Sequence, residues 1–109
     1  MISFVIPAHD EERSIGATLA AIHGAAAGRA YEIVVGADSC TDRTREISLE
    51  HGARVVPVAV RQIAAARNAG AAAARGELLV FVDADTRVSR ELVDAVVDVV
   101  GLGAVGGGA

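Results

Sequence analysis

Short apolar runs of about five residues alternate along this chain with longer segments in which apolar residues recur at helical spacing. Such alternation is typical of repeated strand–helix–strand units, which build a parallel sheet covered by helices. The sequence predicts strands at 2–6, 32–35, 55–60 and 78–82, and helices at 12–27, 42–52, 62–75 and from the cap Ser89 to Val100. We therefore expect an α/β fold, with residues 1–109 forming a single domain.

The composition supports one hydrophobic core without covalent staples. The chain has 109 residues, 52% of them hydrophobic, which is enough to bury a layered core. Its single cysteine, Cys40, cannot form an internal disulfide, which favours a reducing compartment. No apolar stretch reaches the ~18 residues that a spanning helix needs. We predict a cytoplasmic protein, with the inner face of the membrane as the alternative.

The charge balance speaks against one class of partner. The chain carries 14 acidic residues against 10 basic ones, for a net charge of -4. Affinity for nucleic acid comes largely from cationic side chains that displace counterions. We therefore expect no nucleic-acid partner.

The C-terminal segment is unusually rich in glycine. Residues 103–109 are predicted to open another strand, which would leave an unpaired sheet edge at the end of the chain. We interpret the chain as the N-terminal piece of a longer protein, truncated after the fourth helix. A homo-oligomer would help to cover the tail strand.

Polar residues directly follow three of the predicted strands. Ligands of open parallel sheets bind beyond the carboxyl ends of the strands, so these residues are the candidates for a site. They are Pro7, Ala8, His9, Asp10 and Glu11 after the first strand, Asp38, Ser39 and Thr41 after the second, and Asp83, Ala84, Asp85 and Thr86 after the fourth. We expect three acidic clusters on one rim.

Asp83 and Asp85 are candidates for holding a metal. At ~4 Å separation and an effective dielectric constant of about 20, two carboxylates repel by about 4 kcal/mol. A hard divalent cation such as Mg²⁺ or Mn²⁺ would remove that repulsion and take carboxylate oxygens as ligands. The alternative is a pair of solvated turn aspartates, which is the commoner explanation of an isolated D-x-D sequence.

Three further side chains have both a ligand-binding and a structural explanation. Arg67 precedes the fourth strand, and its guanidinium could hold diphosphate oxygens or lie on the surface of an alanine-rich helix. His9 could stack on a base or donate to a phosphate, or make an ordinary hydrogen bond. Glu12 is better explained by the positive end of the first helix.

Four ordered blocks of the chain together resemble glycosyltransferase family 2, whose members have the GT-A fold and use nucleotide-diphosphate sugars. The blocks are ISFVIPAHDEE at 2–12, DSCTDRT at 38–44, ARNAG at 66–70 and FVDAD at 81–85. The chain departs from the family pattern at Gly36, which replaces a branched residue. It also has Ala37-Asp38 in place of an Asp-Asp pair and His9-Asp10 in place of Tyr-Asn.

The resemblance implies a Rossmann-like, three-layer parallel sheet and a set of roles for residues at its edge. Pro7, Ala8, His9, Glu11 and Asp38 would wall a nucleoside pocket. Arg67 would lie by the base and phosphates, Asp83 would approach the ribose, and Asp85, with Asp83, would bind Mn²⁺ or Mg²⁺.

The resemblance also implies an activity. The function would be metal-dependent transfer of a sugar from a nucleotide-diphosphate donor to an acceptor, with this chain carrying the donor-binding half. The catalytic base is expected beyond residue 109, so the chain alone should bind nucleotide and metal without transferring sugar.

Two alternatives to this function stay open. One is a non-catalytic nucleotide-binding fragment, which would share the same site. The other is a sugar-phosphate nucleotidyltransferase, which calls for a glycine-rich, basic loop where residues 7–12 are acidic.

Overall fold

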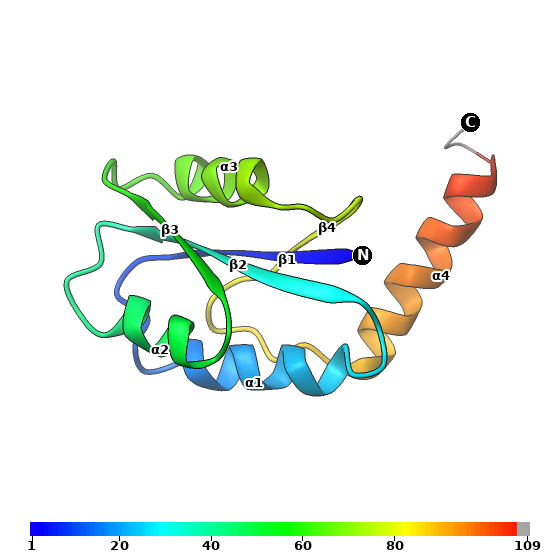
Figure 1. The fold of residues 1–109 in the computed structure, drawn as a ribbon, viewed down its shortest axis with the longest axis horizontal. Helices are drawn as coiled ribbons and strands as arrows, with labels where there is room; N and C mark the ends of the chain where they lie inside the picture. The colour runs from blue at the N-terminus through cyan, green and yellow to red at the C-terminus, as the bar shows by residue number, and fades with distance from the viewer. Residues whose placement is uncertain (107–109) are drawn as a thin grey trace.

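The computed structural model describes residues 1–106, which form four parallel strands alternating with four α-helices. The strands stand in the order β3-β2-β1-β4 (Figure 1). The elements are β1 Ile2–Ala8, α1 Ile15–Ala25, β2 Tyr31–Asp38, α2 Thr44–Glu50, β3 Arg54–Val58, α3 Ile63–Ala73, β4 Leu78–Phe81 and α4 Arg90–Gly106. The predicted α/β class, with a parallel Rossmann-like sheet, is confirmed.

The helices lie in two layers around the sheet. Helices α1 and α2 cover one face, α3 covers the other, and α4 extends away from the body (Figure 1). Because strand side chains alternate between faces, Phe4 and Ile6 pack with the α1 stripe. That stripe consists of Ile15, Leu19 and Ile22, and all three are fully buried.

The α3 face is built from small residues. A Cβ atom added to Gly36 of β2 would collide with the backbone carbonyl of Ala66, and one added to Gly70 would lie 2.6 Å from a methyl group of Val5. Interiors are close-packed, so neither position leaves room for a side chain. Gly36, where the family pattern has a branched residue, therefore lets α3 approach the end of β2.

Several helices and strands begin or end at residues other than those predicted, in part because hydrogen bonds connect the loops between them. The first helix begins at Ile15, later than predicted, because the amides of Glu11 and Glu12 donate to side chains at the start of α2 and just before it, Thr44 and Asp42. Helix α2 begins at Thr44, two residues later than predicted, so Thr41 does not cap it. Strand β1 continues past its predicted end at residue 6 to Ala8, so Pro7 lies inside it.

The last two elements also differ from expectation. Strand β4 is an edge strand, and Leu79 and Phe81 are 38% and 47% exposed. Its four residues are all apolar, as is typical of a buried strand. Ser89 caps α4 as predicted, since its hydroxyl accepts the amide of Leu92.

The predicted tail strand is wrong where the structure describes it. Helix α4 continues to Gly106, and residues 107–109 lie outside the described part. A helix satisfies its backbone internally, whereas a new strand needs a neighbour to pair with. Among the described residues, no helix is both long enough and apolar enough to cross a membrane.

Candidate functional site

The five residues predicted to wall a nucleoside pocket do line a single pocket. It has a volume of about 220 Å³ and lies where β1 and β2 end and α3 begins. Its lining consists of the predicted Pro7, Ala8, His9, Glu11 and Asp38, joined by Arg61, Ile63 and Ala66. We call it the Asp38 pocket. The structure thus brings the five residues together, and what they bind stays a prediction.

Asp38 is almost entirely buried, at 3% exposure, and its carboxylate holds the loop between β3 and α3. One oxygen accepts the amides of Val60 and Arg61, at 3.1 and 2.8 Å, and the other accepts the amide of Gln62 at 2.7 Å. Burial by itself would raise the pKa of Asp38, but these hydrogen bonds outweigh it and lower the pKa. The carboxylate is therefore ionised and committed to backbone donors.

His9 is held by the same strand end. Its Nδ1 donates to the carbonyl oxygen of Asp38 at 2.8 Å, and its Nε2 lies 3.4 Å from the carboxylate of Asp10. The imidazole ring is thereby fixed at the pocket wall.

Arg61 and Ile63 line the pocket but were not among the predicted site residues. The position of Arg61 was a signal, because it lies in the loop after β3 at the same edge of the sheet, and Ile63 begins the helix that follows. The prediction extended the third strand to Val60 and started the helix at Gln62, so Arg61 directly followed the predicted strand but was not counted among the site residues. Arg61 has a φ of +53°, in the left-handed region that residues other than glycine seldom adopt.

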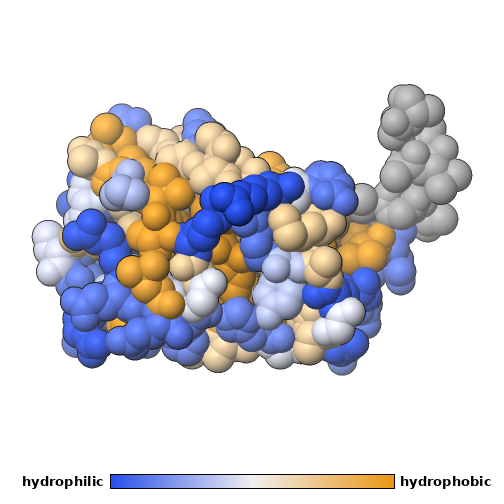
Figure 2. Space-filling view, viewed as in Figure 1, coloured by the Kyte–Doolittle hydropathy of each residue, from blue (hydrophilic) through white to orange (hydrophobic). Residues whose placement is uncertain are grey.

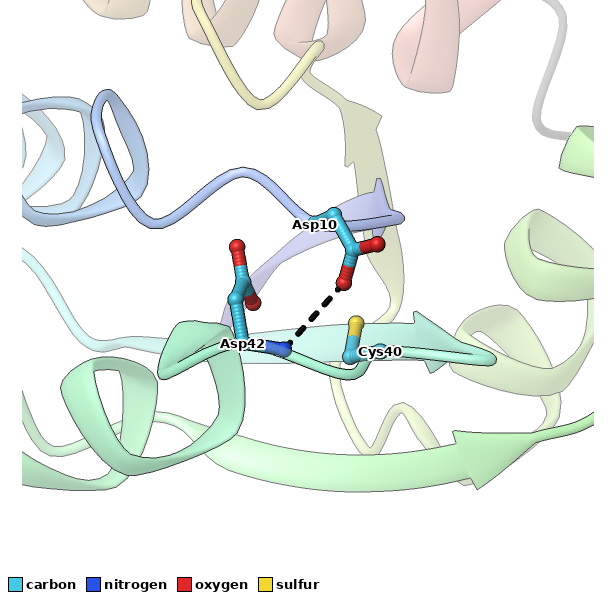
Figure 3. Close-up of side chains that lie close together, drawn as sticks. All are labelled: Asp10, Cys40 and Asp42. Atoms are coloured by element: carbon cyan, nitrogen blue, oxygen red, sulfur yellow. Dashed lines mark hydrogen bonds between the residues drawn. The ribbon is translucent and has the colours of Figure 1, made fainter.

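A second cluster joins the loops that follow β1 and β2 (Figure 3). Asp10 accepts the amide of Thr41 at 2.7 Å, and Asp42 accepts the amides of Thr44 and Glu12 at 2.9 and 3.1 Å. We call Asp10, Thr41, Asp42 and Thr44 the loop clamp. Its hydrogen bonds lower the pKa of Asp10, chiefly through Thr41, and lower the pKa of Asp42 against the opposing effect of burial.

Cys40 completes a group with Asp10 and Asp42 whose ligand atoms lie within 4.8 Å of one another (Figure 3). Burial raises the pKa of its thiol, so the sulfur stays protonated at neutral pH. The carboxylates beside it already accept backbone amides. This group is explained by its role in joining two loops and is not assigned to a metal.

Asp83 and Asp85 lie on the turn after β4 and are exposed. Neither carboxylate accepts a hydrogen bond or forms an ion pair among the residues that the structure describes. The turn itself is anchored, because the buried hydroxyl of Thr18 in α1 donates to the carbonyl of Ala84 at 2.6 Å. Thr18 is a positioning residue that the sequence did not reveal.

Arg67 and Asp83 line a second pocket, of about 200 Å³, which wraps around the edge strand β4. The guanidinium carbon of Arg67 lies 5.6 Å from the centre of the Phe81 ring, a cation–π contact. The rest of the lining is mainly apolar and includes Val80, Val93 and Val97. Figure 2 shows apolar residues on the surface at the base of α4. Asp85 lines neither this second pocket nor the Asp38 pocket.

Solved structures with this arrangement of elements are glycosyltransferase-like in fold. The TarS fragment 1–349 of S. aureus superposes with a TM-score of 0.73 at 23% identity, over 89% of this chain and 31% of that one. A mycobacterial protein gives a TM-score of 0.74 at 33% identity, over 92% of this chain and 36% of that one. Sheet, helices and polar edge therefore define a Rossmann-like α/β protein of the GT-A type.

The family follows from the sequence match. Residues 3–105 match the family model described as glycosyl transferase family 2, and the chain belongs to that family. No curated protein matches the chain.

Glucosyl-3-phosphoglycerate synthase from Mycobacterium tuberculosis is a further similar structure. It is 31% identical, with a TM-score of 0.71, over 90% of this chain and 38% of that one. It was solved with Mn²⁺, uridine diphosphate and glucosyl-3-phosphoglycerate. The chain thus spans 31%, 36% and 38% of these three structures.

Proposed function

We propose that this chain is the donor-binding part of a metal-dependent glycosyltransferase that takes a sugar from a nucleotide-diphosphate donor. The donor would lie along the carboxyl edge of the sheet. Its nucleoside would enter the Asp38 pocket, and its diphosphate would reach the turn that carries Asp83 and Asp85.

One observation carries the proposal. Five residues chosen from the sequence, from the end of β1, the loop after it and the end of β2, line one pocket beside the N-terminus of α3. Pockets for small ligands combine apolar walls with a few polar groups that orient the ligand. Pro7, Ala8 and Ala66 supply such walls, and Glu11 supplies a carboxylate that can accept hydrogen bonds from ribose hydroxyls.

The residues on the β4 turn fit a divalent metal. Asp83 and Asp85 present exposed carboxylates that are free of protein partners in the described part of the chain. Mn²⁺ and Mg²⁺ prefer such oxygen ligands, completed by water and phosphate oxygens. A divalent ion held there would stabilise the negative charge of the departing diphosphate.

The other groups at this edge orient and neutralise the donor. Arg67 lines the same pocket as Asp83, the one beside β4, and its planar guanidinium can donate two hydrogen bonds to phosphate oxygens. Phe81 holds it in place through the cation–π contact. The hydrogen bond from Thr18 to Ala84 keeps the turn with Asp83 and Asp85 against α1.

Titration of the purified chain with uridine diphosphate and guanosine diphosphate tests the proposal. Calorimetry with Mn²⁺ and with a chelator should show at least about tenfold tighter binding of one nucleotide when the metal is present. Asp85→Ala should abolish that gain. The matched control is Asp98→Ala, which removes an exposed aspartate of α4.

Equal nucleotide affinity with and without metal would rule out the proposed role of Asp83 and Asp85. A guanosine preference would keep the site and change the donor. The expected cytoplasmic location is part of the same proposal and is supported by the single free cysteine.

A further inference from the structure

We infer that the backbone amide of Asp85 donates a hydrogen bond to the diphosphate of the donor, and that the buried hydroxyl of Thr18 is the positioning group that orients this amide. The inference rests on the proposed function, which brings the diphosphate to the turn after β4, and deepens it. It adds a main-chain donor to the two carboxylates of that turn. It also gives Thr18, a residue of α1, an effect on the affinity for the diphosphate.

The first step is the anchoring of the turn. The amide of Val82 donates to a carbonyl of β1 at 3.0 Å, and the amide of Thr86 donates to the carbonyl of Asp83 at 3.0 Å. Between these two bonds, the hydroxyl of Thr18 donates to the carbonyl of Ala84 at 2.6 Å. Thr18 and Ala84 are both buried, so this bond is shielded from water. The backbone of the turn is therefore held at three points.

The second step is the direction of the peptide group that joins Ala84 to Asp85. No peptide bond among the described residues is cis. In a planar trans peptide group the C=O and N–H bonds point in opposite directions. Because the carbonyl of Ala84 points toward Thr18 in α1, the amide of Asp85 points away from that helix. The hydroxyl of Thr18 therefore sets the orientation of the Asp85 amide as well.

The third step is the availability of this amide to a ligand. Within residues 1–106, the amide of Asp85 has no hydrogen-bond acceptor, whereas the amide of Thr86 is already occupied. Asp85 is exposed, so a ligand can reach this part of the turn. Carboxylates repel phosphate oxygens, whereas backbone N–H groups attract them. A free amide on the same residue as a carboxylate therefore suits an anionic ligand such as a diphosphate.

Amide hydrogen exchange in the original chain, measured by NMR, tests the donor. The ligands are uridine diphosphate and uridine, or the guanosine pair if the chain prefers that base, in Mg²⁺ because Mn²⁺ is paramagnetic. Saturating diphosphate should slow exchange at the amide of Asp85 by at least about tenfold, while uridine or Mg²⁺ alone should change it by less than about twofold. The amide of Thr86, which donates to Asp83 in the free chain, should change little with either ligand.

Thr18→Val tests the positioning role, because valine keeps the shape of threonine and releases the carbonyl of Ala84. By calorimetry in Mn²⁺, we expect the diphosphate to bind about tenfold more weakly and the nucleoside to bind within about twofold of its original affinity. Thr18→Ser, which keeps the hydroxyl, should restore most of the loss. The matched control is Ser48→Ala, which removes another fully buried hydroxyl, one that donates to the carbonyl of Thr44 within α2. It should leave both affinities within about twofold of the original.

The outcomes separate this inference from the proposed function. An original chain that binds neither uridine nor guanosine diphosphate in Mn²⁺ or Mg²⁺ overturns both. Diphosphate binding that leaves the Asp85 amide unprotected, or that Thr18→Val does not weaken, overturns the inference alone. Equal weakening of nucleoside and diphosphate by Thr18→Val also overturns it, because Thr18 would then support the whole fold. If Thr18→Val does not fold, exchange at the Asp85 amide of the original chain still decides.

Discussion

The two halves of this sheet use acidic residues in opposite ways. In the closed half, formed by β1, β2, β3 and α3, the carboxylates of Asp10, Asp38 and Asp42 each accept backbone amides. In the open half, formed by β4, its following turn and α4, Asp83 and Asp85 are exposed and have no partner among the described side chains. Carboxylates that look alike in the sequence therefore divide into those that hold loops and those left for a ligand.

Packing follows the same division. Helix α3 presses on the closed half through Gly36 and Gly70, whereas β4 leaves Leu79 and Phe81 at the surface. Ala66, which a side chain at Gly36 would meet, also lines the Asp38 pocket. The exposed turn keeps its carboxylates accessible, as metal binding requires.

The largest expected change in the free energy of unfolding comes from disturbing the packing of the closed half. Gly36→Ala places a methyl group against the Ala66 carbonyl, a backbone atom that can move only with α3. We expect the free energy of unfolding to fall by roughly 3 kcal/mol or more, measured by urea denaturation. The matched control, Gly24→Ala, lies in open space within α1 and should gain about 0.5 to 1 kcal/mol. Equal stability of the two variants would contradict the close contact.

A nearly equal change in the free energy of unfolding is expected at Glu32, another carboxylate of the closed half that accepts hydrogen bonds from the protein. Burial would raise its pKa, but the amide of Arg75, the hydroxyl of Ser3 and the guanidinium of Arg54 together lower the pKa to about 2 from 4.5. Because the folded pKa is the lower one, the stabilisation is complete above about pH 5 and is lost as the pH falls toward 2.

The shift corresponds to roughly 3 kcal/mol. Glu32→Gln should therefore be less stable than the original chain at pH 7, and the gap should close near pH 2. Urea midpoints across this range measure it. A gap that does not change with pH would mean that the charge of Glu32 contributes nothing.

The smallest effect on stability is expected in the open half. Asp85→Asn should change the free energy of unfolding by less than about 0.5 kcal/mol, because the carboxylate is exposed and holds no backbone group. The same variant should lose the Mn²⁺-dependent gain in nucleotide affinity. A large loss of stability would erase the distinction between the two halves.

The sequence predicted the fold class and five of the residues that line the Asp38 pocket, with limits that have physical causes. The local spacing of apolar residues was enough to locate the four strands and four helices. The residues at which they begin and end depend on hydrogen bonds to other parts of the chain. Threonine is a residue type that often caps helices. The amide of Thr41 nevertheless donates to Asp10 of another loop, and α2 begins at Thr44. Arg61 was missed for a different reason, because the residues after the third strand carry neither an acidic cluster nor one of the four family-like blocks.

By itself, the sequence determined the parallel α/β class, the family and the set of residues that follow each strand, because periodicity and motif order are local properties of the chain. Only the tertiary structure decided which of those residues share a pocket and which acidic groups are free. That decision rests on where backbone amides of one loop meet carboxylates of another, and chain order does not encode such distances. Asp38 and Asp85 follow strands of similar appearance, and their surroundings alone separate the buried residue from the exposed one.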